Sequence, residues 1–404
     1  MSFLRVLSKP TIAVLWGGQV LSAIGDHLFL IAIMWLAVKQ AGSAAGIVTA
    51  AGALSALLFG LFGGVFADRW DRRLTLIGVD ILRALAVGIL PVLAWLGNLQ
   101  LWHLVVAAIV VETLDTLFGP ALQASIPLLI ADSKTLYTVN GLMDATQRFA
   151  RVLGPGMAGA LLLVLPLVHF FTLDAISFCM SALALSSLGR HFPWQPLATD
   201  ATEPASDSSL FAHIRGALQL LRTHQTLSWM LVSLGLVNMA WSAAFTVGVP
   251  LLTNQSLGGS AGIYGLIVGV YGVGNIISLF IGNLAIGRRL ITMFIGEIVL
   301  GVGFLLLASA TNVGVALLGS AIAAIGSPLG DLILLTLIQV DFPAGHIGKI
   351  YSVRMLIGGT GLMLGSLLAV PLFHLFSIPV SIALCAIFIM SIGVAGVIRF
   401  RTRR

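Results

Sequence analysis

Charged side chains are scarce in this sequence. Only 9% of its 404 residues are Asp, Glu, Lys or Arg, whereas soluble proteins carry about 25%. Hydrophobic residues make up 58% of the chain. A chain of this composition cannot cover its surface with groups that water solvates, which excludes an ordinary soluble domain and predicts a membrane protein.

Several kinds of chemistry lack their sequence signatures. The two cysteines, Cys179 and Cys385, each lie in an apolar run, which favours small core residues over a disulfide framework or a metal cluster. The sequence contains no Walker loop, dinucleotide fingerprint, zinc pattern or nucleophile elbow. These absences argue against an ATP-driven pump and against an intramembrane enzyme. We therefore expect no catalytic residues, no cofactor and no metal.

Long apolar runs fill most of the chain. A helix that crosses about 30 Å of hydrocarbon needs roughly 20 residues. The sequence predicts an all-α membrane protein with twelve transmembrane helices, at about Ile12–Val38, Ala44–Phe66, Leu74–Leu96, Leu101–Leu122, Val139–Leu165, Val168–Leu188, Thr226–Leu252, Ala261–Ile286, Leu290–Ala308, Val313–Ile338, Ile350–Phe373 and Ile378–Ile398. The first run is too long for the apolar core of a signal peptide, so we expect it to be a membrane helix.

The distribution of basic residues predicts the orientation. If the N-terminus is cytoplasmic, 19 of the 21 Lys and Arg residues fall on the cytoplasmic side, as the positive-inside rule requires. This explains the net charge of +6 without nucleic acid as a partner. We expect a multi-pass protein of the inner (cytoplasmic) membrane with both termini in the cytoplasm.

The longest polar stretch divides the runs six and six. We expect an N-terminal six-helix bundle over residues 1–190, a cytoplasmic linker over 191–225, and a C-terminal six-helix bundle over 226–404. Within the linker, Leu210–Thr223 has apolar residues at helical spacing, which predicts an amphipathic helix on the membrane surface.

A charged loop follows the second run. It has the pattern Gly-x-x-x-Asp-Arg-x-x-Arg-Arg, whose named positions are Gly64, Asp68, Arg69, Arg72 and Arg73. This pattern resembles the loop between helices 2 and 3 of major facilitator superfamily transporters. Leu21–His27, Leu153–Gly159 and Gln339–Pro343 resemble the branch that contains macrolide-efflux and enterobactin-exporter-like proteins. The resemblance implies two six-helix bundles around a midplane site, and a secondary exporter.

The loop is interpreted as an inner gate. Asp68 is expected to cap the third helix, while the arginines bind carboxylates across the seam between the halves or anionic lipid headgroups. A purely topogenic role for the basic cluster is the alternative. In the fifth run, Gly154, Pro155 and Gly156 predict a kink, because proline removes a helical hydrogen bond.

Acidic residues inside apolar runs are candidates for transport. An ionised side chain at midplane costs at least about 2.5–3.5 kcal/mol, so such groups are paired, hydrated or titrating. Gln19, Ser22 and Asp26 share one face of the first helix, which the resemblance places along the central cavity. Asp26 is therefore either a proton- or substrate-linked carboxylate or a structural acid that bonds a neighbouring helix.

Two acids share one face of the fourth helix. Because Glu112 and Asp115 are three residues apart, both cannot ionise cheaply, and at least one is expected to bind a proton readily. The alternative is a permanent ion pair with Arg83, Arg148 or Arg151.

Other charged groups have mainly structural interpretations. Asp144 and Arg148 are spaced for a pair within the fifth helix, which leaves Arg151 to bind an anionic substrate or neutralise an acid. Asp80 and Arg83 are expected to neutralise one another or a fourth-helix acid. Asp174, Glu297 and Asp331 lie nearer the ends of their runs, where structural roles are commoner.

The second half carries aromatic and amide side chains at helical spacing. They are Asn238, Trp241 and Phe245 on the seventh helix, and Tyr264, Tyr271 and Asn275 on the eighth. Such walls suit bulky amphipathic ligands, although the same pattern occurs in ordinary cores. Asn238, Trp241, Phe245, Tyr271 and Asn275 are taken as cavity-lining candidates.

Together these features predict a proton-coupled exporter of an amphipathic small molecule, such as a drug or a siderophore. Its partners would be the substrate, protons and membrane lipids, and a monomer suffices. A facilitator or importer of a small solute, a lysophospholipid-type lipid transporter, and a non-transporting receptor or scaffold are the alternatives. Buried acids on several helices disfavour the last of these.

Overall fold

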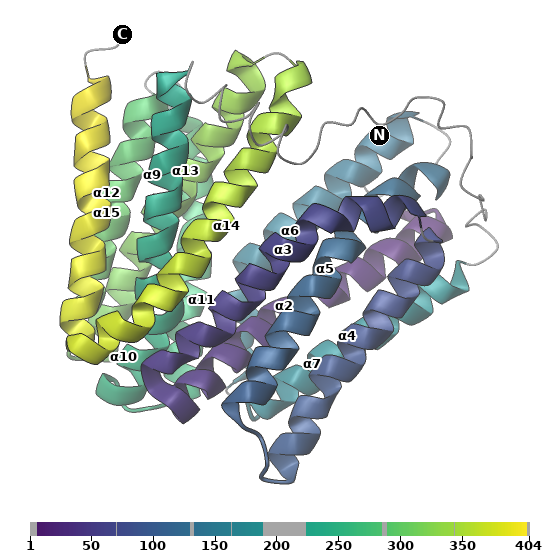
Figure 1. Cartoon of the computed structure of the whole chain (residues 1–404), viewed down its shortest axis with the longest axis horizontal. Coiled ribbons are helices and arrows are strands. Elements are labelled where there is room, and N and C mark those ends of the chain that lie inside the picture. The colour runs from purple at the N-terminus through teal and green to yellow at the C-terminus, as the bar shows by residue number, and fades with distance from the viewer. Residues whose placement is uncertain are drawn as a thin grey trace. The chain divides into compact units, whose positions relative to one another are not determined.

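The computed structural model describes residues 6–69, 71–129, 133–162, 164–188, 224–284, 289–342 and 344–401, and the regular elements in these ranges are helices without strands. The chain divides into two compact units (Figure 1). The first comprises Met1–Ala41 with Ala51–Thr199, and the second comprises Gly42–Ala50 with Asp200–Arg404. Nearly all of the predicted linker 191–225 lies outside the described residues, so its predicted boundaries and amphipathic helix stay predictions.

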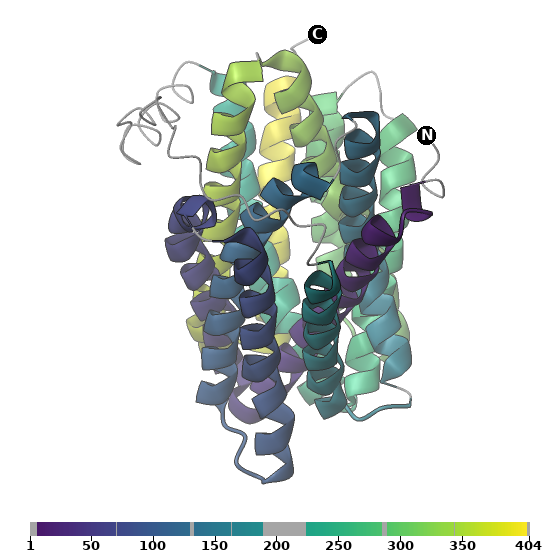
Figure 2. The same cartoon turned by 90° about the vertical axis from the view of Figure 1, so that its right-hand side faces the viewer.

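The first unit is built from long helices that are rich in apolar residues. They are α2 (Pro10–Ala41), most of α3 (Gly46–Arg69), α4 (Arg72–Trp95), α5 (Leu101–Leu129), α6 (Ser133–Leu161) and α7 (Val168–Ser187). A short 3₁₀ turn, η1 (Gly42–Ala45), joins α2 to α3. Helix α7 packs against both α2 and α4. Figure 2 shows the helices after a 90° turn.

The second unit begins with one helical run that changes its winding. Helix α9 (Gln225–Trp241) passes into a π-helical segment, η2 (Ser242–Gly248), and then into α10 (Val249–Ser256). The other helices are α11 (Ala261–Leu284), α12 (Arg289–Ala308), α13 (Val313–Asp341), α14 (Ala344–Leu375) and α15 (Ile378–Phe400). Helix α12 packs against α13 and α15.

The predicted helix bounds agree with most of these elements. In the described residues, ten helical stretches are long and apolar enough to cross a membrane. The first of them, Pro10–Gly60, joins α2 to α3 through η1, and α6 is not among them because of its polar first half. A multi-helix membrane fold is therefore confirmed, while the count of twelve crossings stays a prediction. Helix α6 also begins at Ser133 and ends at Leu161, earlier than the predicted Val139–Leu165.

Glycines let α9 and α14 pack in direct backbone contact. A Cβ atom added to Gly361 would meet the carbonyl oxygen of Gly235, and one added to Gly365 would meet that of Met239. The hydroxyls of Ser242 and Ser366 continue this seam with a hydrogen bond of 2.7 Å. Close packing at such small-residue pairs is the usual way for membrane helices to associate.

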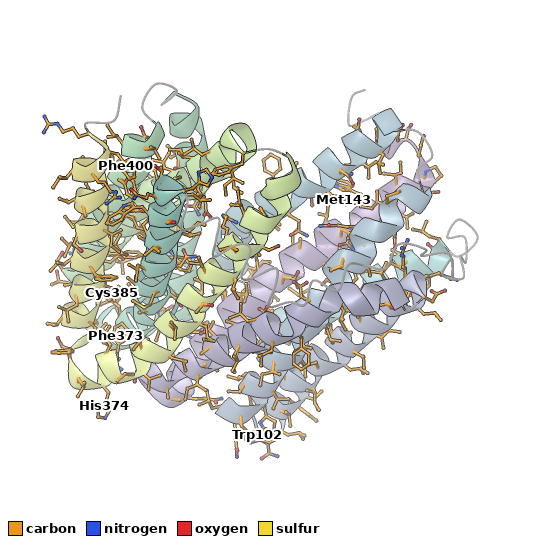
Figure 3. All side chains as sticks on the ribbon, turned by 45° about the horizontal axis from the view of Figure 1, so that its top comes forward. Trp102, Met143, Phe373, His374, Cys385 and Phe400 are labelled. Carbon is orange, nitrogen blue, oxygen red and sulfur yellow. The ribbon has the colours of Figure 1, made fainter. Side chains whose placement is uncertain are left out.

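Aromatic side chains fill the second unit away from this seam. The Phe294 and Phe400 rings stack with centroids 5.6 Å apart, and Cys385 is buried on α15 (Figure 3). Cys179, by contrast, is exposed on α7, so its prediction as a core residue was wrong. An apolar run does not distinguish a buried cysteine from an exposed one, because the outer face of a membrane helix is apolar as well.

The residue that caps the N-terminus of α4 is Asp71, and not Asp68 as the sequence had predicted. Helix α3 continues to Arg69, so Asp68 is still helical and Asp71 is the residue that precedes α4. The Leu74 backbone N–H donates a hydrogen bond of 2.8 Å to Asp71 Oδ1. The Arg73 guanidinium donates to the carbonyl oxygen of Ser186, 2.9 Å away in the last turn of α7, where a positive charge is favourable.

The Asp71 cap gives a small, testable contribution to stability. Asp71→Ala removes the acceptor for Leu74, and we expect it to lower the free energy of unfolding by about 1 kcal/mol. Denaturant titration of the purified protein by circular dichroism measures this change. Asp71→Asn keeps an acceptor and is expected to stay close to the wild-type value. Equal losses in both variants would contradict the capping role.

Candidate functional site

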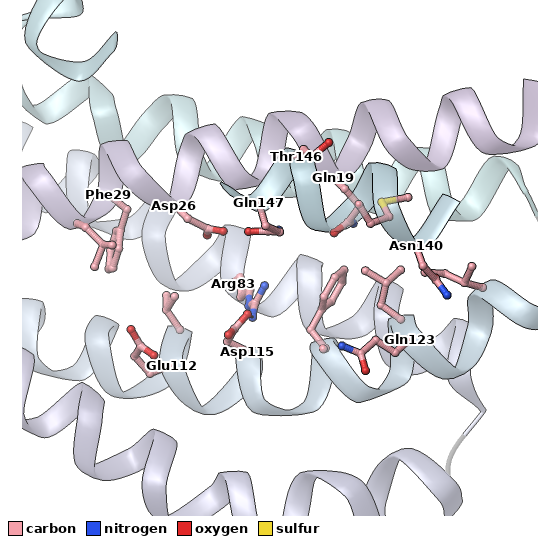
Figure 4. A pocket seen from close by; sticks show the side chains of 17 residues that line it. Gln19, Asp26, Phe29, Arg83, Glu112, Asp115, Gln123, Asn140, Thr146 and Gln147 are labelled. Carbon is pink, nitrogen blue, oxygen red and sulfur yellow. The ribbon is translucent and has the colours of Figure 1, made fainter. Parts of the chain in front are cut away.

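The first unit encloses a pocket of about 690 Å³ between α2, α4, α5 and α6 (Figure 4). Its wall is mixed, with apolar side chains between carboxyl, amide and guanidinium groups. The residues that line it are Gln19, Asp26, Phe29, Leu30, Arg83, Val111, Glu112, Asp115, Phe118, Gly119, Leu122, Gln123, Ile126, Asn140, Met143, Thr146 and Gln147.

Helix α2 forms one wall through residues at helical spacing. Gln19 and Asp26 are two turns apart, so both face the pocket. The neighbouring Gly25 allows α2 to approach α7, because a Cβ atom there would meet the carboxylate of Asp174. Ser22, predicted to share this face, is buried but does not line the pocket.

Helix α5 forms the opposite wall. Glu112 and Asp115 begin a face that continues through Gly119 and Gln123 to Ile126. All five residues therefore follow the three- and four-residue spacing of one helical stripe. In Figure 4 the carboxyl groups of Glu112 and Asp115 lie on the same side of the pocket, with Asp26 on the facing helix.

A salt bridge between α4 and α5 defines the centre of the site. Arg83 Nη2 lies 2.6 Å from Asp115 Oδ1, and the Arg83 side chain is 3% exposed while that of Asp115 is 67% exposed. The guanidinium carbon also lies 5.2 Å from the Phe118 ring centroid and 5.4 Å from that of Phe178. Two aromatic faces and one carboxylate thus hold a buried cation, a strongly fixed arrangement.

This geometry decides between the predicted partners of Arg83. The fourth-helix acid Asp115 is the partner, whereas Asp80 makes no ion pair with Arg83. A mutual Asp80–Arg83 pair is therefore wrong, because Arg83 extends toward α5. The Asp331–Arg354 pair, with N and O 2.8 Å apart, is a comparable salt bridge in the second unit.

Some predicted site residues fall on side chains that the structure does not describe. These are Asp144, Arg148 and Arg151 on α6, and Gly64, Asp68 and Arg69 on α3. Their roles stay predictions, as does the kink at Gly154, Pro155 and Gly156. Gly154 itself lies against the ring of His27, where an added Cβ atom would clash.

The predicted aromatic wall of the second unit forms one cluster. Trp241 Nε1 donates a hydrogen bond of 2.8 Å to the Tyr271 hydroxyl, and the Phe245 ring lies 4.1 Å from the Tyr271 ring. The Asn238 amide donates to the Gly358 carbonyl at 3.4 Å, and Asn275 Oδ1 is buried without a hydrogen-bond partner in the described residues. Their contact with substrate stays a prediction.

Sequence reasoning missed four polar residues of the pocket, which are Gln123, Asn140, Thr146 and Gln147. Gln123 continues the stripe of Glu112 and Asp115, so extending that face by two turns finds it. Asn140 and Gln147 are two turns apart on α6. The polar first half of this helix was interpreted as a weak membrane span, so its polar residues were not considered as part of a pocket. Thr146 also accepts a hydrogen bond of 2.7 Å from Trp16 Nε1.

Comparison with known families decides the identity of the chain. A family model of the major facilitator superfamily, described as transmembrane secretion effector, matches residues 1–325. The chain belongs to this family. The protein is thus a transporter of the major facilitator type, as its loop pattern predicted.

Relatives of the transporter include efflux proteins. It is 24% identical to the MFS-type transporter YfiS of Bacillus subtilis strain 168, over 95% of this chain and 92% of YfiS. It is 28% identical to macrolide efflux protein A of Streptococcus pyogenes over 43% of each chain. The multidrug efflux pump Tap of Mycolicibacterium fortuitum is 29% identical over 48% of this chain and 49% of Tap. These two alignments span less than half of either partner.

Solved structures share the fold of the transporter. The POT family transporter PepTSo matches with a TM-score of 0.74 at 13% identity, over 97% of this chain and 98% of PepTSo. The nucleoside transporter NupG also has a TM-score of 0.74, at 11% identity over 97% and 100% of the two chains. At these identities the likeness concerns the fold alone.

Proposed function

We propose that this transporter is a proton-coupled exporter of amphipathic small molecules that carry a positive charge, working by alternating access in the inner membrane with both termini in the cytoplasm. The observation that carries the proposal is the pocket of the first unit, in which Asp26, Glu112 and Asp115 face a single arginine among the described lining residues. Efflux relatives support export, and the distribution of Lys and Arg supports the orientation.

The charge of the pocket favours a cationic substrate. Arg83 already binds Asp115, which leaves Asp26 and Glu112 as carboxyl groups without an ion pair among the described residues. The rings of Phe29 and Phe118 add apolar surface. A volume of about 690 Å³ lies within the range of roughly 300–1,000 Å³ that drug-sized ligands occupy.

The same carboxyl groups suit proton coupling. A carboxylate in a low-dielectric site is stable either with a bound proton or beside a cation. Proton and substrate cation therefore compete for Asp26 and Glu112, so that arrival of one releases the other. A proton that moves down about 150 mV supplies roughly 3.5 kcal/mol, which supports a substrate gradient of several hundredfold.

Asp26→Asn is expected to reduce proton-driven transport at least tenfold. Inside-out vesicles that hold the transporter are given an acidic interior, and uptake of ethidium, a permanently cationic aromatic probe, is measured by fluorescence. The amide that replaces the carboxyl group binds no proton, so the pH gradient no longer drives exchange at this position. Asp331→Asn is the matched control, because it removes a carboxylate outside the pocket.

Each alternative has its own signature in this assay. Wild-type uptake that a protonophore leaves unchanged contradicts proton coupling and favours a facilitator. Movement of a fluorescent lysophospholipid without ethidium uptake favours a lipid transporter. Full uptake by Asp26→Asn removes Asp26 from the coupling path.

A further inference from the structure

A second carboxyl group lies beside Arg83 but outside the pocket. Asp80 is one helical turn before Arg83 on α4 and is 0% exposed. Neither of its carboxyl oxygens makes a well-formed hydrogen bond to a described residue, although the Ser181 hydroxyl on α7 is near enough to influence the carboxyl group. The established pair of Arg83 and Asp115 gives this residue no role.

The surroundings of Asp80 disfavour its ionised form. A fully buried carboxylate without a cation or a hydrogen bond loses its hydration and gains nothing in return. The carboxyl groups on the helices around it are Asp26 on α2, Glu112 and Asp115 on α5 and Asp174 on α7, and Arg83 is the cation among the described residues of this cluster; of these groups, Arg83 and Asp26 act directly on Asp80. With Arg83 bound to Asp115, burial therefore favours the protonated form of Asp80.

Arg83 is placed to change partners. Its Nη2 binds Asp115, while its Nε is buried without a hydrogen-bond partner. The Phe118 and Phe178 rings lie over the guanidinium and leave its edges open to in-plane donation. Because Asp80 is three residues before Arg83, the two side chains share one face of α4.

We propose that Asp80 is the alternative partner of Arg83, which moves from Asp115 to Asp80 when Asp115 takes up a proton. Asp115 gains one proton from the pocket, and Asp80 releases one proton to it. The trio of Arg83, Asp115 and Asp80 stays neutral before and after the exchange.

The exchange gives the buried arginine a partner in both protonation states. Without Asp80, protonation of Asp115 would leave a buried guanidinium without a carboxylate, an arrangement that is strongly unfavourable. Asp80 thus makes protonation of Asp115 feasible, and it acts as a positioning residue. Its link to transport rests on the proposed function, whereas the exchange itself is testable without any substrate.

Infrared difference spectroscopy of the purified transporter tests the exchange. A protonated carboxyl has a C=O stretching band that a carboxylate lacks, and Asp80→Asn identifies the band of Asp80. We expect this band in the wild type at neutral pH. We expect it to be lost in Asp115→Asn, which imitates protonated Asp115 and sends Arg83 to Asp80.

Two matched variants control the measurement. Asp115→Glu keeps the negative charge and is expected to retain the Asp80 band. Asp174→Asn changes an equally buried carboxyl on α7, and it too is expected to retain the band.

The outcomes separate this inference from the proposed function. An Asp80 band that persists in Asp115→Asn overturns the exchange, as does a wild type without the band. In the ethidium assay, Asp80→Asn is expected to lower proton-driven uptake at least tenfold. If the infrared result holds while wild-type vesicles take up no ethidium, the exchange stands and the proposed substrate class fails.

Discussion

Arg83→Gln is expected to abolish proton-driven uptake and to lower the free energy of unfolding by about 1–3 kcal/mol, because a charged hydrogen bond is lost but the Asp115 carboxylate left behind is 67% exposed. Arg83 is the cation that the described acids of the first unit surround, and its side chain is only 3% exposed. Without it, Asp115 loses its partner, and the space between the Phe118 and Phe178 rings holds a neutral amide. Thermal unfolding in detergent and ethidium uptake in vesicles measure the two effects.

The controls for Arg83 separate charge from shape. Arg83→Lys keeps the charge but loses the planar stacking between two rings, so we expect a folded protein with uptake reduced about tenfold, equivalent to roughly 1.4 kcal/mol. Arg354→Gln removes the arginine of the Asp331 pair, whose side chain is 12% exposed rather than 3%, and this change is expected to cost only about 0–1 kcal/mol. Wild-type uptake by Arg83→Gln would show that the buried cation is dispensable.

Gly365→Val is expected to prevent correct assembly of the second unit. The added Cβ atom would meet the Met239 carbonyl oxygen, and this obstacle is backbone rather than the mobile end of a side chain. Helices α9 and α14 must then separate, which breaks the Ser242–Ser366 hydrogen bond as well. Overpacking typically costs about 1–3 kcal/mol and more where backbone has to move. Loss of monodisperse protein on size-exclusion chromatography is the expected result.

A glycine without such a neighbour provides the comparison. No atom lies within 4 Å of a Cβ atom added to Gly78 on α4. We expect Gly78→Ala to be neutral or to stabilise the helix by about 0.5–1 kcal/mol. A monodisperse, thermally stable Gly365→Val protein would contradict the direct contact between α9 and α14.

Composition and periodicity predict the helices of this protein well, because long apolar segments in a membrane have few alternatives to helix. The main errors at helix ends concern α5, which continues to Leu129 rather than Leu122, and α14 and α6, which start at Ala344 and Ser133 rather than Ile350 and Val139. Polar residues were treated there as a break, although a helix that lines a polar pocket tolerates them. The cap at Asp71 was missed for a related reason, since the charged loop was expected to be longer than it is.

The sequence predicts which helix faces line the candidate site, but it does not predict which charged residues pair with one another. Spacing along one helix places Glu112 and Asp115 on one wall, and the pocket contains both. It cannot tell which acid Arg83 reaches, because that depends on how α4 and α5 are rotated about their axes. The sequence also could not show that Asp80 lacks an ion pair. Its spacing from Arg83 suggests that the two residues pair, but Arg83 pairs instead with Asp115 on the neighbouring helix α5.

The salt bridge between α4 and α5 also bears on how the chain enters the bilayer. A lone α4 would carry Arg83 into hydrocarbon at a cost of about 2.5–3.5 kcal/mol on insertion scales. Only Leu96–Gln100 separates α4 from α5, so the two segments are close enough to leave the translocon as a hairpin. Asp115 then neutralises the arginine during biogenesis, and a longer connection between the two segments is expected to lower the yield of inserted protein.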